Sequence, residues 1–172
     1  MIATQSSRKG SATVTITSDT DILVERKFDA PARKVFKAYT TPEHVKRWWG
    51  FETGEWLHCS IDLREGGTWR YVTRETRGDH TFEVGFHGTY QEIDAPSRIV
   101  HTEVYEGLPV EDPDEHAAID FVDFIEADGV TTLRVLSRMP SKEARDGLLA
   151  SGMETGMQVS YDRMEQLFAE ID

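Results

Sequence analysis

Strand-like patterns fill the middle of this sequence, and one long helical pattern follows them near its end. From Glu55 to Ser137, apolar and polar residues alternate in short runs separated by turn signals such as Asp128-Gly129, which predicts a series of strands. The last apolar residues recur at intervals of three and four, as on one face of a helix, at Met153, Met157, Tyr161, Met164, Phe168 and Ile171. A sheet this long needs its apolar face covered, and the final helix is the only predicted element large enough. We therefore expect an α+β fold in which an antiparallel sheet wraps around the C-terminal helix.

Turn and capping signals assign the remaining elements. Residues 12–28 are rich in β-branched side chains and predict strand, with a break from Thr17 to Asp21. Asp29-Ala30-Pro31 and Thr41-Pro42-Glu43 each combine a capping residue with a proline, which the first helical turn tolerates, and they predict two short helices in tandem. Further strands are predicted at residues 56–64, 68–76, 81–93, 98–105, 118–126 and 130–137, with an exposed loop at 106–115 and a short helix at 142–150.

Length and charge limit the class of protein. At 172 residues the chain fits one domain, which we expect to span residues 1–172 with a flexible segment at residues 1–11. The net charge is −12, from 31 acidic and 19 basic residues, and this acidic balance argues against binding to nucleic acid or to anionic membranes. No apolar stretch resembles a secretory signal or a membrane span. Because Cys59 is the only cysteine, no internal disulfide can form, and we expect a cytoplasmic protein.

A spaced set of short motifs is similar to a known family. The motifs are Phe28-Asp29-Ala30-Pro31, Val35-Phe36, Thr41-Pro42-Glu43, Trp48-Trp49, Asp62-Leu63-Arg64, Gly66-Gly67, Gly88-Thr89-Tyr90-Gln91-Glu92-Ile93 and Gly152-Met153-Glu154-Thr155-Gly156. From about residue 20 to its end, the chain resembles the activator of heat-shock-protein-90 ATPase homologue-like family, within the SRPBCC (START-like, Bet v-like) superfamily. The resemblance implies a helix-grip fold, in which a curved antiparallel sheet grips the C-terminal helix over a hydrophobic cavity.

Aromatic and methionine side chains are the candidates for lining such a cavity. Aromatic rings with a polar tip can hold an apolar ligand and orient it by one or two hydrogen bonds, and methionines adapt to its shape. The candidate ligand-pocket residues are Trp56, Trp69, Tyr71, Phe86, His101, Tyr105, Met153, Gly156, Met157 and Tyr161. Gly152 and Gly156 indicate either a strip left free for a ligand or close packing of the helix on a strand, and Gly152 also fits a helix start. Each aromatic or methionine taken alone equally fits a simple core role.

Polar pairs on the predicted strands are the candidates for chemistry. His101 and Glu103 share one strand face, and they would form a buried acid–base pair if that face points inward. Two further pairs raise the same question, His58 with Asp62 and His87 with Glu83. Alternation does not identify the inner face because both faces of these strands are mixed, and the solvent-facing orientation is favoured for all three pairs. The sequence has no zinc, nucleotide-binding or nucleophile motif, so we expect neither a metal nor a cofactor.

Three functions fit these features. The favoured one is non-catalytic binding of a small hydrophobic or aromatic ligand in an internal cavity. The second is a cavity-based enzyme of the polyketide cyclase type, which the superfamily resemblance implies, with His101 and Glu103 as its acid–base pair. The third is stimulation of a chaperone ATPase, which the family name suggests but which transfers poorly, because only about twenty residues precede the matching region. A homodimer through strand edges is left open, and the sequence does not identify the ligand.

Overall fold

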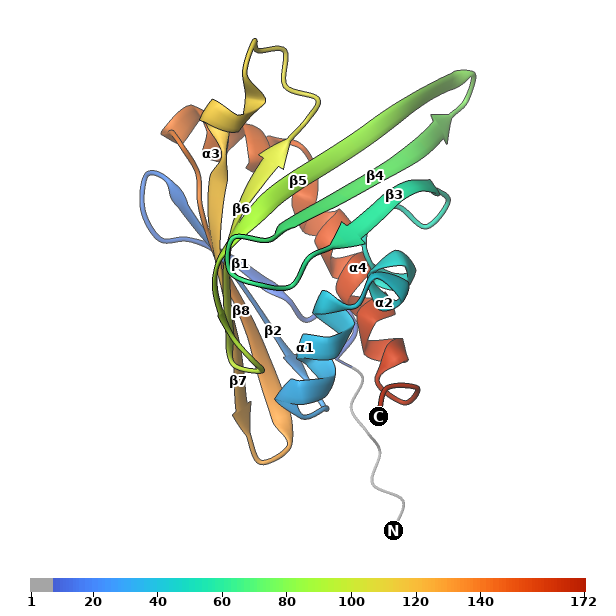
Figure 1. The fold of residues 1–172 in the computed structure, drawn as a ribbon, viewed down its shortest axis with the longest axis vertical. Coiled ribbons are helices and arrows are strands. Elements are labelled where there is room, and N and C mark those ends of the chain that lie inside the picture. The colour runs from blue at the N-terminus through green and yellow to red at the C-terminus, as the bar shows by residue number, and fades with distance from the viewer. Residues whose placement is uncertain (1–7) are drawn as a thin grey trace.

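The computed structural model describes residues 8–172, in which the strands form one curved, open antiparallel sheet (Figure 1). The strand order across this sheet is β1-β2-β8-β7-β6-β5-β4-β3. The strands are β1 (Thr13–Ile16), β2 (Asp21–Phe28), β3 (Glu55–Ile61), β4 (Thr68–Arg77), β5 (His80–Asp94), β6 (Arg98–Tyr105), β7 (Ala118–Ala127) and β8 (Val130–Arg138). The helices are α1 (Ala32–Thr40), α2 (Pro42–Trp48), α3 (Lys142–Ala150) and α4 (Met153–Leu167), with one short 3-10 turn, η1 (Pro113–His116).

The predicted helix-grip arrangement is confirmed. Helix α4 runs along the concave side of the sheet, with α2 packed against it and α1 packed against α2, β7 and β8 (Figure 1). At the other end of the molecule the β4–β5 hairpin extends beyond the remaining strands. No helix within residues 8–172 is both long and apolar enough to cross a membrane.

The predicted elements are present, with small differences at their ends. The expected break separates β1 from β2, and the strand expected at 56–64 ends at Ile61. The expected cap of α1 is wrong: Pro31 occupies the cap position, and the Asp29 carboxylate instead accepts two hydrogen bonds from Arg8, at 3.1 and 2.9 Å. Thr41 does occupy the cap position of α2, but its side chain makes no capping hydrogen bond.

The inner face of the sheet can be followed from the strand register. Val24, Val135, Val122 and Ile99 pair in turn across β2, β8, β7 and β6, and each is 8% exposed or less. This apolar row belongs to the same core cluster as Tyr161, Met164 and Leu167 of α4. The neighbouring row, which pairs in the same way, contains Ile22, Ser137, Asp120, His101 and Tyr90. A polar row therefore lies beside the apolar core on the face that α4 covers.

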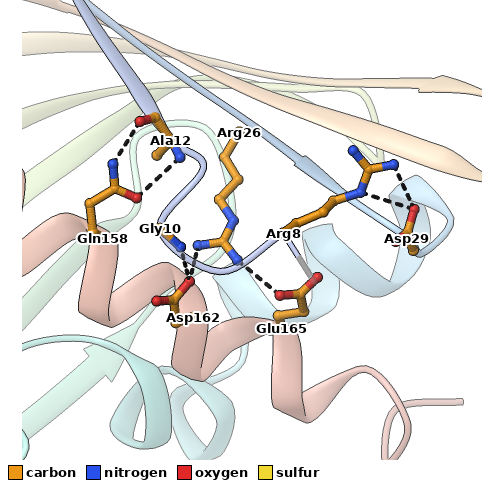
Figure 2. A network of polar contacts seen from close by, with 8 residues as sticks. All are labelled: Arg8, Gly10, Ala12, Arg26, Asp29, Gln158, Asp162 and Glu165. Atoms are coloured by element: carbon orange, nitrogen blue, oxygen red, sulfur yellow. Dashed lines mark hydrogen bonds and ion pairs between the residues drawn. The ribbon is translucent and has the colours of Figure 1, made fainter. Parts of the chain in front are cut away.

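A buried ion-pair network joins α4 to β2 and to the segment before β1 (Figure 2). Arg26 of β2 is 2% exposed; its guanidinium donates to Asp162 and, at 2.9 Å, to Glu165, both on α4. The backbone N–H of Gly10 also donates to Asp162, at 3.0 Å, so this carboxylate joins the N-terminal segment, β2 and α4.

The same network reaches into residues 1–11, the segment that was expected to be flexible. Residues 1–7 lie outside the described residues, whereas Arg8 and Gly10 are held by side chains from distant parts of the chain. The side-chain amide of Gln158 exchanges two hydrogen bonds with the backbone of Ala12, at 3.1 and 2.6 Å. These contacts join residues 8–12 to Asp29 and to helix α4.

Candidate ligand-binding site

Three polar side chains meet on the inner face where β6, β7 and β8 lie next to each other. Asp120 and His101 are 5% and 6% exposed, although both are polar and face the core. The Ser137 hydroxyl donates to the Asp120 carboxylate at 2.5 Å. His101 Nδ1 lies 3.9 Å from Asp120 Oδ2 and 3.0 Å from the carbonyl oxygen of Thr102, which accepts its hydrogen bond. Because a carbonyl oxygen can only accept, Nδ1 carries the proton of this hydrogen bond.

Glu103 adds a second carboxyl group to this place. It lies two residues beyond His101 on the same face of β6, and it hydrogen-bonds Asp120 of the neighbouring strand. Burial raises the pKa of Glu103 well above its ordinary value of 4.5, and the negative charge and hydrogen bond of Asp120 raise it further. The raised pKa means that Glu103 gives up its proton less readily than an exposed glutamate does. The Glu103 side chain is surrounded by protein, but it is not fully buried. A solvent-accessible space therefore lies next to it.

Three tyrosines from three different elements lie within electrostatic range of these carboxyl groups. Burial raises the pKa of Tyr39 on α1, Tyr71 on β4 and Tyr161 on α4, and the charge of Glu103 contributes to all three shifts. Asp120 contributes to the shifts of Tyr39 and Tyr161. None of the three hydroxyls has a hydrogen-bond partner within residues 8–172. We call Glu103, Asp120, Tyr39, Tyr71 and Tyr161 the carboxyl–tyrosine cluster.

Aromatic rings from the end of α2 and from β3, β4 and β5 form a wall beside this cluster. The ring of Trp49 lies 5.3 Å from Tyr71 and 5.6 Å from both Trp56 and Phe86, measured between centroids. Trp69 lies 4.8 Å from Tyr71 and meets the His101 ring edge-on at 5.3 Å. The structure therefore brings together five of the predicted pocket residues: Trp56, Trp69, Tyr71, Phe86 and His101. Tyr105 stacks on Phe86 at 5.2 Å but is 39% exposed at the end of β6, so it lies at the rim.

Helix α4 supplies the other predicted pocket residues. Met153 and Met157 are half-buried and pack against the core cluster, and Tyr161 is 7% exposed. Gly152 precedes the first helical residue with φ of 81°, a left-handed conformation, so the helix-start interpretation is confirmed. Gly156 is exposed, and a Cβ atom there would meet nothing within 4 Å. The close-packing interpretation is therefore wrong for Gly156.

The favoured outward orientation is wrong for His101 and Glu103. The strand register places both on the inner face, in line with the buried Asp120. The outward orientation does hold for the other two pairs. His58 and Asp62 are exposed, while His87 and Glu83 lie on the outer face opposite Arg70 and Arg74.

Sequence reasoning missed Asp120, Ser137 and Tyr39. A signal for Asp120 was present, because it interrupts a series of alternating apolar residues in β7, between Ala118 and Val122. An acid at an inward-facing position of a strand indicates either a partner or a function. Tyr39 follows Val35 and Phe36 at helical spacing, where only its hydroxyl distinguishes it from a core residue.

Within residues 8–172 the structure shows no metal centre. Its surface hollow in the outer loops does not suit an apolar molecule. Within residues 8–172 no group of three or more His, Cys, Asp or Glu side chains is placed to hold a metal ion. A surface hollow of about 470 Å³ is lined by Val110, Glu111, Asp112, Glu115 and His116, around η1. None of the predicted pocket residues lines it, and four of its five lining residues are polar or charged, so we assign the candidate site to the carboxyl–tyrosine cluster instead.

Comparisons with known proteins agree with this fold. Residues 29–169 match the family model described as Activator of Hsp90 ATPase homolog 1-like protein. The structure is similar to a crystal structure from Rhodobacter sphaeroides, with a TM-score of 0.81 and 22% identity over 93% of this chain and 99% of that one. Protein Ms6760 from Mycobacterium smegmatis gives a TM-score of 0.76 and 22% identity over 91% and 96% of the two chains.

A more distant similarity is to DynU16, described as a putative protein in the dynemicin biosynthetic locus. Its TM-score is 0.63 and its identity 19%, over 88% of this chain and 48% of that one. At identities this low, these structures support the fold alone. A search of curated protein sequences finds no match.

Proposed function

This chain belongs to the Activator of Hsp90 ATPase homolog 1-like family, and from this premise and the carboxyl–tyrosine cluster we propose that it binds a small, largely apolar ligand between its sheet and helix α4. The polar end of the ligand contacts the cluster. Its apolar body lies between the aromatic wall of β3, β4 and β5 and the methionines of α4.

One observation carries this proposal: three tyrosine hydroxyls within electrostatic range of Glu103 have no hydrogen-bond partner in residues 8–172, and each keeps some accessible surface. Leaving a buried hydroxyl without a hydrogen bond costs about 1–3 kcal/mol, and native proteins rarely tolerate several such groups in one place. Water or a ligand satisfies these groups when the protein is in solution. The surrounding aromatic and methionine side chains favour a ligand with a large apolar part.

The direct test is saturable binding of a neutral apolar fluorophore, N-phenyl-1-naphthylamine, together with native mass spectrometry of the purified protein. We expect fluorescence to rise to a plateau as the probe leaves water. Met157→Trp fills the space under α4 and should abolish the signal, whereas Val159→Trp is the matched control, since Val159 is 44% exposed on the same helix. No bound mass together with no saturable probe binding would contradict the proposal.

A second candidate function is proton transfer to or from the bound molecule. It is favoured by the position of His101 beside Asp120 and Glu103 on the inner face of the sheet, and by the raised pKa of Glu103. We expect such an enzyme to accelerate exchange of the α-protons of an aromatic ketone, 2-tetralone, in D2O, followed by NMR. Glu103→Gln and His101→Gln should each remove the acceleration, and an exchange rate equal to that of buffer would exclude this function for that substrate class.

Stimulation of a chaperone ATPase stays a prediction from the family name. It is tested by adding the protein to the chaperone and measuring ATP hydrolysis.

A further inference from the structure

The turn between α2 and β3, residues 50–54, lies against the inner face of the β4–β5 hairpin. A Cβ atom on Gly54 would come within 2.2 Å of Glu75 Oε1, so the backbone of the turn rests directly on this carboxyl group. A Cβ atom on Gly50 would lie 3.9 Å from Thr73 Cγ2. Thr73 and Glu75 are two positions apart on β4, and their side chains therefore share one face of the strand. The turn covers this face.

Two polar side chains are buried beneath the turn without a partner. Thr73 and Glu75 are 2% and 3% exposed. Within residues 8–172, neither Thr73 Oγ1 nor Glu75 Oε1 has a hydrogen-bond partner, and both atoms are closed off from water. A buried polar atom without a hydrogen bond is unfavourable. Because water would reach both atoms if the turn moved away, the closed position has a free-energy cost that opening removes.

A contact near the surface holds the turn closed. The guanidinium of Arg77 on β4 lies 5.1 Å from the ring centroid of Phe51, which belongs to the turn, and 5.6 Å from that of Phe82 on β5. Phe51 and Phe82 are 46% and 38% exposed, and cation–π contacts at exposed sites are weak. We call this contact the latch. A weak latch above unpartnered polar atoms favours a segment that opens readily.

The start of the turn is fixed to helix α4. Arg163 Nη2 donates to the carbonyl oxygen of Trp48, at 2.7 Å, and to that of Gly50. Gly50 adopts φ of 78°, a left-handed conformation that glycine reaches without strain. The backbone N–H of Gly54 donates to the carbonyl oxygen of Phe51 at 3.3 Å, which closes the turn on itself. Residues 51–54 are therefore built to move as one unit about Gly50.

We propose that residues 50–54 form a lid, which hinges at Gly50 and opens the space between the sheet and α4 from the side of the β4–β5 hairpin. Opening uncovers Thr73, which is two positions from Tyr71 of the aromatic wall on the same face of β4. The inference rests on the proposed function for the molecule that passes through the opening. The movement itself needs no ligand.

The first test measures access to the covered face without any ligand. Thr73→Cys is introduced into a Cys59→Ser background, and the rate of its labelling by the neutral reagent iodoacetamide reports how often the lid opens. Arg77→Gln removes the latch and should make labelling about fivefold faster. Arg134→Gln, an exposed arginine on β8, is the matched control and should leave the rate unchanged. Thr68→Cys, exposed on β4, should label rapidly with or without the latch.

The second test follows the association and dissociation of N-phenyl-1-naphthylamine by stopped-flow fluorescence. Thr73→Val removes the unpartnered hydroxyl with little change of shape, so it should favour the closed lid and slow both rates about tenfold. The closed lid is favoured equally with and without the ligand, and the dissociation constant should therefore stay unchanged. Thr68→Val, the same substitution at an exposed position of β4, is the matched control.

The outcomes separate the lid from ligand binding. Labelling that is no faster in Arg77→Gln would overturn the lid, whether or not the fluorophore binds. Equal binding rates in wild type and Thr73→Val would also overturn it, because the fluorophore would then enter elsewhere. If the fluorophore does not bind at all, the proposed function fails, and the labelling rates alone decide whether the lid opens.

Discussion

Glu103 and Asp120 hydrogen-bond each other between neighbouring strands on the inner face of the sheet, although no lysine or arginine within residues 8–172 pairs with either. Two carboxyl groups in one buried place cannot both ionise without a large penalty, and this is why the pKa of Glu103 lies well above 4.5. The pair therefore lowers the stability of the folded protein at neutral pH, which gives a direct test of the geometry.

Glu103→Gln should stabilise the protein at neutral pH. Below the ordinary pKa of 4.5, Glu103 is protonated in both the folded and unfolded states and its ionisation has no effect. As the pH rises above 4.5, the unfolded chain loses this proton while the folded chain keeps it, so the wild type loses stability up to the folded pKa. In urea unfolding, the free energy of unfolding of the variant should exceed that of the wild type by about 1 kcal/mol at pH 7.5. At pH 4.5 the two values should be nearly equal. A difference that does not change with pH would contradict a protonated Glu103.

The hydroxyl of Tyr161 should matter little for stability, because it has no partner in the described chain. Tyr161→Phe keeps the ring against Phe28, at 6.0 Å between centroids, and is expected to change the free energy of unfolding by less than about 0.5 kcal/mol. The matched control is Thr131→Val, because the fully buried Thr131 hydroxyl donates to the carbonyl oxygen of Ala30 at 2.7 Å. That variant should lose about 1 kcal/mol or more. Equal losses in both variants would mean that Tyr161 has a partner in solution even without ligand.

Two glycines of the last helix should respond to alanine in opposite directions. Gly156→Ala should raise the free energy of unfolding by about 0.5–1 kcal/mol, because the helical residue meets nothing within 4 Å of the added Cβ atom. Gly152→Ala should lower it, because alanine is strained at φ of 81°. Both values can be measured by thermal or urea unfolding. If Gly156→Ala lowered the free energy of unfolding, the inference that the space beside Gly156 is open would be wrong.

The fold was predictable from the sequence because two periodicities specify it. Alternation defined the strands from β3 to β8, and the stripe that includes Met157, Tyr161 and Met164 defined α4. The candidate site was less predictable, because alternation assigns His101 and Glu103 to one face without saying which face is inside. That choice depends on the sheet as a whole: Val122 and Ile99 pair in the row next to Asp120 and His101, and the entire face turns toward α4. The capping error at Asp29 has a similar cause, since Arg8 lies 21 positions away in the sequence and competes for its carboxylate.

The buried network of Arg26 should contribute far more to stability than an exposed ion pair. Arg26→Met leaves Asp162 and Glu165 without their cation beside the core, and we expect it to cost about 2 kcal/mol or more. Arg47→Met is the matched control, because Arg47 and its partner Glu170 are about half exposed, and water screens this pair so that it should contribute far less. Urea unfolding of the two variants checks the difference. Similar losses would show that the network in Figure 2 does not hold α4 to β2.

A histidine on the outer face should make the loop after β6 sensitive to pH. The His87 ring donates to Glu106 at 2.8 Å and to Asp114 at 2.7 Å. Burial alone would lower the pKa of His87, but the two carboxylates outweigh it and raise the pKa above 6.5. The stabilisation that protonated His87 gives to the fold is therefore complete below pH 6.5. It is lost as the pH rises through the pKa of His87 in the folded protein.

Hydrogen exchange of residues 106–117 tests this switch. We expect the loop to exchange slowly at pH 6 and faster at pH 8.5, beyond the intrinsic increase with pH. In His87→Gln this difference should disappear, while the exposed control His80→Gln on the β4–β5 hairpin should behave as wild type. Arg70 keeps its own two hydrogen bonds to Glu106 at every pH in this range, since the pKa of Glu106 is lowered to about 2, mainly by Arg70. The loop should therefore loosen around Asp114 and η1 before it loosens at Glu106, and exchange that begins at Glu106 would contradict the assignment.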